Sequence, residues 1–146
     1  MKVQRGGQVV DVPIEREPLA VRQQDFRRRI NRERDRRIAA AASFVRDDGT
    51  AFRPDLRSAR DVQNITAIAL DAKIARDLGQ AGTVQFRAAD NQTYDLSLDE
   101  AIRLGREVKA LNTAHYASAW ALKDGLPDTH EGLDSHDVTD DSHWPA

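Results

Sequence analysis

Residues of the types that carry chemistry are concentrated in two stretches of this 146-residue chain. Seven arginines lie between residues 27 and 37, where they could grip phosphate groups. Three histidines alternate with aspartates in residues 124–146, where they could ligate a metal ion. The fourth histidine, His115, lies in a predicted helix and could act as a general base if a nucleophile stood beside it.

The arginine-rich stretch is interrupted by acidic residues. Asp25–Arg29 and Glu33–Arg37 have the i,i+4 spacing of ion pairs on one helix. A nucleic-acid reader needs a basic face with few acids and with aromatic side chains for base stacking. We therefore expect a solvated helix face or a protein interface, and nucleic-acid binding is disfavoured.

The histidines do not form a recognisable site. His130, His136 and His143 are spaced by six and seven residues, which matches no metal-ligand motif. His115 has no candidate nucleophile or second base near it, and no glycine-rich phosphate loop, serine elbow or calcium loop is present. The sequence thus predicts no catalytic residue, no metal and no cofactor, and we expect a protein that is not an enzyme.

Composition narrows the class of protein further. The chain is 40% hydrophobic and 32% charged, and it contains no cysteine, which excludes disulfides and thiolate zinc sites. No run of 18 or more apolar residues is present, so we expect no membrane partner. Although the net charge is only −2, residues 124–146 hold seven acidic residues and no Lys or Arg. These residues show no apolar period and are predicted to be an irregular, solvated acidic tail.

Three helices must position whatever surface the protein uses. The first is predicted from Leu19 to Ala42, after Pro18, and the second from Ser58 to Leu78. The third begins at the capping box Ser97-x-x-Glu100 and ends near Lys123. On the second helix, one face is predicted to carry Val62, Ile65, Ala69, Ala72 and Leu78, with Ile68 and Ile74 beside it.

Short β-prone pieces separate the helices. Residues 43–52 flank the turn dipeptide Asp48-Gly49, and residues 83–96 alternate about Asp90-Asn91. Residues 1–18 are predicted to be an arm with a small hairpin at Gly6-Gly7 that needs a surface to dock on. The sequence therefore predicts an α+β fold with three helices, two small β-hairpins, an extended N-terminal arm (1–18), a helical and hairpin domain (19–123) and an irregular acidic C-terminal tail (124–146).

Interface candidates follow from these elements. The third helix carries a seam of apolar positions at alternating spacings of three and four, suited to packing on a neighbouring helix. The two tryptophans are candidate anchors, and the valines of the arm favour an extended backbone. The candidates are Val9, Val10, Val12, Leu104, Val108, Leu111, His115, Trp120 and Trp144.

The order and spacing of several segments resemble a domain of unknown function that is common in phage and prophage tail genes, within or beside tail-fibre and tail-fibre-assembly proteins. The resemblance covers about residues 30–124. The matching segments are Arg34–Ala40, Phe52 with Asp55 and Ser58, Asn64-Ile65, Phe86–Asn91, and Leu96–Glu100 with the later Tyr116 and Ala117.

This resemblance implies a structural or accessory component of a bacteriophage tail, in the tail-fibre or baseplate region. The expected partners are other tail proteins and further copies of the chain, and the expected location is the virion. An alternative is a tail-fibre assembly chaperone that is absent from the mature particle. A third reading is a small DNA-associated protein that uses the arginine-rich helix.

Overall fold

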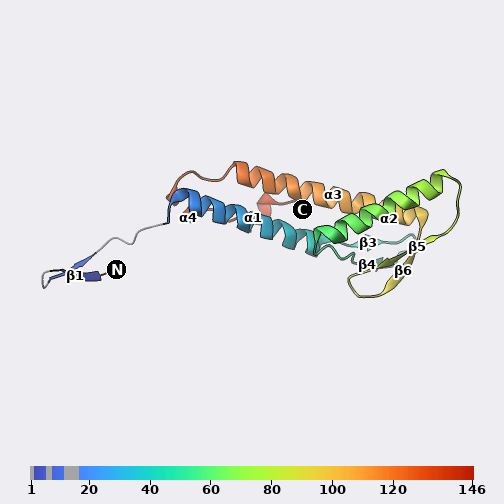
Figure 1. Ribbon diagram of the computed structural model, residues 1–146, viewed down its shortest axis with the longest axis horizontal. Helices are drawn as coiled ribbons and strands as arrows, with labels where there is room; N and C mark the ends of the chain where they lie inside the picture. The colour runs from blue at the N-terminus through green and yellow to red at the C-terminus, as the bar shows by residue number, and fades with distance from the viewer. Residues whose placement is uncertain (1, 6–7, 12–16) are drawn as a thin grey trace.

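The computed structural model describes residues 2–5, 8–11 and 17–146 (Figure 1). The predicted α+β class is confirmed, because three long helices are accompanied by small antiparallel sheets of two strands each. At the N-terminus β1 (Lys2–Arg5) pairs with β2 (Gln8–Asp11), as the predicted hairpin requires. Of the valines predicted in this arm, Val9 and Val10 belong to β2, whereas Val12 lies outside the described residues.

Helix α1 (Leu19–Ala41) follows Pro18 and runs antiparallel to α3 (Leu98–Asp124), as Figure 1 shows. Phe26, Ile30 and Ile38 form the buried stripe of α1, as the spacing of four predicts. Ser97 begins α3 with the predicted capping box: its hydroxyl accepts from the Glu100 amide, and the Glu100 carboxylate accepts from the Ser97 amide.

Helix α2 (Ala59–Asp77) packs along the N-terminal half of α3 (Figure 1). It begins with a second capping box, between Ser58 and Asp61. It ends before Gly79, which has a φ of 71°, a conformation that glycine adopts without steric cost.

Two hairpins lie between the helices: β3 (Phe44–Val45) with β4 (Ala51–Phe52), and β5 (Thr83–Arg87) with β6 (Thr93–Ser97). Both turns lie where the sequence predicts them, with φ angles of 85° at Gly49 and 67° at Asn91.

The hairpins contribute aromatic rings to the first of two cores. The Phe52 ring lies 5.3 Å from Phe44, 5.5 Å from Phe86 and 4.6 Å from Tyr94, measured between ring centroids. This main core also contains Leu56, Ile65, Leu96 and the inward residues of α3 up to Val108. It fixes α2 and both hairpins on the N-terminal half of α3.

The second core holds the other half of the molecule together. It joins α1 to the end of α3 and to the segment after it, which contains the short helix α4 (His130–Asp134) and the 3-10 turn η1 (Asp141–His143). Its buried members are Phe26, Ile30, Ala119, Leu122, Leu133, Val138 and Trp144.

The predicted C-terminal tail needs correction. Residues 124–146 are largely irregular and many of their side chains are exposed, as expected, but the segment is not a free tail, because three apolar residues pack it on α1 and α3. Leu133, Val138 and Trp144 are buried with 1%, 6% and 6% of their surface exposed. Because these apolar residues follow no helical or strand period, a search for periodicity overlooks them.

Candidate protein-interaction surfaces

Many of the α1 arginines already have anionic or polar partners. Arg22 donates to the Asp134 carboxylate over 2.8 Å, and Arg29 pairs with Asp25 over 2.7 Å. The guanidinium of Arg34 lies 4.0 Å from the centroid of the Tyr116 ring, where a cation–π contact forms. These contacts direct several of the positive charges inward, onto the protein itself.

Glu33 is the acidic centre of this helix, and only 8% of its surface is exposed. Its carboxylate accepts from Arg36 over 2.6 and 3.0 Å and from Arg37 over 2.7 Å. The hydrogen bond from Arg36, aided by the one from Arg37, holds the pKa of Glu33 below its ordinary value despite burial.

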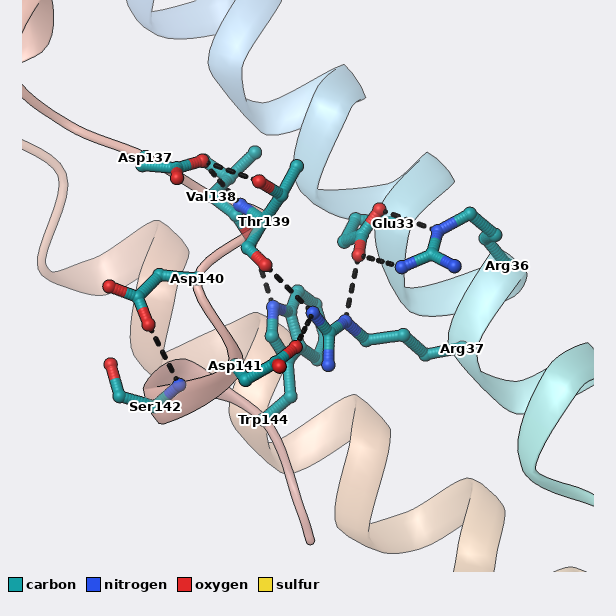
Figure 2. Close-up of polar contacts among 10 residues, drawn as sticks. All are labelled: Glu33, Arg36, Arg37, Asp137, Val138, Thr139, Asp140, Asp141, Ser142 and Trp144. Carbon is teal, nitrogen blue, oxygen red and sulfur yellow. Dashed lines mark hydrogen bonds and ion pairs between the residues drawn. The ribbon is translucent and has the colours of Figure 1, made fainter.

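Arg37 also binds the C-terminal segment (Figure 2). Its Nη2 donates to the Thr139 carbonyl over 2.8 Å and to the Asp141 carboxylate over 2.7 Å. The backbone there is held in turns by Asp137, which accepts from the Thr139 amide, and by Asp140, which accepts from the Ser142 amide. The acidic segment therefore neutralises part of α1 within the same chain.

Trp144 completes this arrangement, which we call the C-terminal clasp (Glu33, Arg37, Thr139, Asp141 and Trp144). Its Nε1 donates to the Val138 carbonyl over 2.9 Å, and its ring centroid lies 5.5 Å from the Arg37 guanidinium (Figure 2). Trp144 was predicted as an anchor for a partner. In the structure Trp144 instead packs within its own chain, and 6% of its surface is exposed.

A second buried carboxylate, Glu100, joins the β3–β4 hairpin to α3. It accepts from the Arg46 guanidinium over 3.2 Å, from the Asp47 amide over 3.1 Å and from the Ser97 amide over 3.0 Å. Burial alone raises the pKa of Glu100, but these donors outweigh it and lower the pKa below its ordinary value. Because all of these donors belong to the folded chain itself, we infer that Glu100 stabilises the fold.

The histidines lie in the body of the protein. His115 is buried on α3, with Nδ1 2.8 Å from the Leu111 carbonyl, and His130 Nδ1 lies 3.0 Å from an Arg22 nitrogen. The rings of His136 and His143 are 5.9 Å apart. Within residues 2–5, 8–11 and 17–146 there is no group of three or more His, Asp or Glu side chains arranged to hold a metal ion.

The predicted seam of α3 is used within the chain. Leu104 and Val108 are buried in the main core, Leu111 packs at its edge, and His115 is 4% exposed. The neighbouring helices of the seam are thus α1 and α2 of the same chain. Of the interface candidates predicted on this helix, only Trp120 is exposed, with 59% of its surface accessible and its ring edge-on to Tyr116.

Sequence reasoning missed an apolar row on the outer face of α2, formed by Leu70, Ile74 and the C-cap residue Leu78. These side chains are 56%, 50% and 69% exposed. The sequence placed Leu78 on one face with Ala72 and placed Ile74 beside that face, and both placements were wrong. Ile74 and Leu78 follow the buried Ala72 by two and six residues, so they lie about 200° and 240° around the helix from it. The spacing of four between members of the row was the signal that could have revealed it.

Beside this row lies a surface groove of about 270 Å³ between α2 and α3, which we call the α2–α3 groove. A Cβ atom added at Gly105 would overlap the Ala69 side chain, so the two helices touch along the floor of the groove. The groove is lined by Thr66, Ala69, Leu70, Lys73, Ile102, Gly105, Arg106 and Lys109.

Among the helices of the described residues, none has the length and apolar character needed to cross a membrane. No curated protein and no solved structure matches the chain. Residues 21–142, which include α2, α3, nearly all of α1, both central hairpins and most of the C-terminal segment, match the model of a protein family described as a domain of unknown function. The chain therefore belongs to the DUF4376 family.

Proposed function

We propose that this protein is a structural or accessory component of a bacteriophage tail, in the tail-fibre or baseplate region, that acts by protein–protein assembly and performs no catalysis. Its partners are other tail proteins and further copies of the chain, and its location is the virion. The phage context rests on the resemblance of segments such as Arg34–Ala40 and Phe86–Asn91 to a tail-associated domain.

The outer face of α2 is the observation that carries an assembly role. A helix that is apolar on one face buries that face, and a helix that is apolar on opposite faces has a second surface to bury. In α2 the inner face supplies Ile65 and Ala72 to the main core, whereas Leu70, Ile74 and Leu78 remain exposed on the outer face. A row of exposed apolar side chains on a monomer is typical of a protein-interaction site.

The arginine contacts favour this proposal over DNA association. Electrostatic binding to the phosphates of DNA needs unpaired cationic side chains along one face of the protein. Arg22, Arg29, Arg36 and Arg37 are instead neutralised by carboxylates of the chain. A gel-shift titration at low salt tests this preference: tight binding to duplex DNA that weakens steeply with added salt would contradict it.

The deciding experiment is quantitative mass spectrometry of purified phage particles, with this protein's copy number measured against a known tail component. A fixed small-integer ratio is the expected result. Absence from particles, with the protein present in infected cells, would overturn the structural role and favour an assembly chaperone that leaves before completion.

A surface variant links that result to α2. The double substitution Leu70→Ser and Ile74→Ser is expected to leave the fold intact, since both side chains are at least half exposed, and to reduce incorporation into particles. Val21→Ser is the matched control, because Val21 of α1 is also 50% exposed but lies outside the row. Equal incorporation of the double variant and the control would remove α2 from the assembly surface.

A further inference from the structure

We propose that the α2–α3 groove binds an acidic amphipathic helix of a partner protein. This inference rests on the proposed assembly function and assigns the chemistry of one partner. It follows from the charge of the groove's rim, the apolar nature of its floor and the row of exposed side chains that continues from one of its edges.

The floor of the groove is apolar and shallow. Ala69 and Gly105 meet at its centre, and Ile102, which is 6% exposed, closes it from below. Leu70 belongs both to the groove and to the exposed row, so the apolar surface continues from the floor to Ile74. A helix lying along α2 would cover this surface as a third helix covers the gap between two packed helices.

The rim of the groove is basic. Lys73, Arg106 and Lys109 contribute three cations, and none of the eight lining residues is acidic. Within the ranges that the structure describes, none of these three side chains makes an ion pair, in contrast to Arg37 and Arg46, which have carboxylate partners. Unpaired cations around an apolar floor are complementary to a ligand with carboxylates flanking apolar side chains.

Other occupants fit less well. A nucleic acid would use the cations but not the aliphatic floor, because base stacking needs aromatic side chains and the groove has none. A second copy would have to offer an acidic apolar segment. The acidic segment of this chain, residues 124–146, already buries Leu133, Val138 and Trp144 against its own helices.

The test uses the full chain and a fluorescent synthetic peptide, helical by design, with leucines at i, i+4 and i+7 on one face and glutamates elsewhere. Binding is followed by fluorescence anisotropy. The rim variant carries Lys73→Glu, Arg106→Glu and Lys109→Glu. The matched control carries Arg28→Glu, Arg32→Glu and Arg60→Glu, which changes the net charge equally at three other cations of α1 and α2. Circular dichroism checks that both variants remain folded.

The expected result is saturable binding by the natural protein and the control, with an affinity loss of roughly tenfold or more in the rim variant. Equal binding of the peptide by both variants would overturn the assigned groove. A lysine version of the peptide that binds the natural protein as well as the glutamate version would overturn the assigned charge.

Two further measurements test the occupant. A duplex oligonucleotide that binds the natural protein but not the rim variant would reassign the groove to nucleic acid. Sedimentation showing a dimer that the rim variant loses would reassign it to a second copy. A failure here leaves the particle-composition result unaffected, so the groove and the tail role fail separately.

Discussion

The two tryptophans provide a test of how the chain is held together, because the sequence predicts both as anchors but the structure buries one and exposes the other. Trp144 is 6% exposed and lies in the C-terminal clasp, whereas Trp120 is 59% exposed on α3. We predict that Trp144→Ala destabilises the protein strongly and that Trp120→Ala leaves its stability nearly unchanged.

The magnitude follows from burial. Replacing a buried tryptophan by alanine typically costs about 3–5 kcal/mol, since the transfer free energy is lost and a cavity remains. For Trp144 the loss includes the Nε1 hydrogen bond to the Val138 carbonyl. An exposed substitution such as Trp120→Ala is expected to change the free energy of unfolding by no more than about 0.5 kcal/mol.

Urea unfolding followed by circular dichroism measures the difference. With a denaturant dependence of about 2 kcal/mol per molar, the Trp144→Ala midpoint should fall by roughly 1.5–2.5 M relative to the natural chain. Each variant also keeps a single tryptophan. Acrylamide should quench the fluorescence of Trp144→Ala, which retains the exposed indole, more than that of Trp120→Ala. Equal midpoints, or equal quenching of the two variants, would refute the packed clasp.

Three further outcomes follow from the buried carboxylates and from the close contact of α2 with α3. Glu100→Gln should lower stability by about 1–3 kcal/mol in urea titrations, because Arg46 and two backbone amides lose their charged acceptor, whereas the half-exposed Glu107→Gln should have little effect. The pKa values of Glu33 and Glu100 are lowered in the folded protein, so their stabilising contribution is present above the ordinary pKa of 4.5 and is lost as the pH falls below it. Urea midpoints measured from pH 6 down to about pH 3 should therefore fall in the natural protein and fall less in Glu33→Gln. The same fall of the midpoint with pH in both proteins would contradict this assignment. Gly105→Ala should lower the thermal midpoint although alanine is the better helix former by about 1 kcal/mol, since its Cβ overlaps α2; a raised midpoint would show that the helices can separate without cost.

Much of the fold could be predicted because its signals are local. The capping box at Ser97 and Glu100 fixes the start of α3, and the turn residues Gly49 and Asn91 fix both central hairpins. Each depends on residues only a few positions apart. The periodic stripe of α1 was equally readable, because Phe26 and Ile30 repeat with the period of a helix.

The surfaces were harder to predict because they depend on distant residues. The pairing of Arg37 with Asp141 joins positions 104 residues apart, and no local pattern announces it. Composition correctly identified an acidic segment, but the partner of that segment was the chain itself. On α2, apolar residues on both faces blur the periodic signal, so only the three-dimensional arrangement separates the inward Ile65 from the outward Ile74.

The division into two cores has a consequence for the order of folding. The main core draws on residues 38–108, whereas the second core must bring Phe26 and Ile30 together with residues 119–144. Closing a longer loop costs more chain entropy, so the second core is expected to form after the first. The second core is then also the part of the native protein that unfolds locally first. Amide hydrogen exchange should therefore be faster, and to a similar extent, in the first half of α1 and in residues 126–144, while the amides of the main core stay protected.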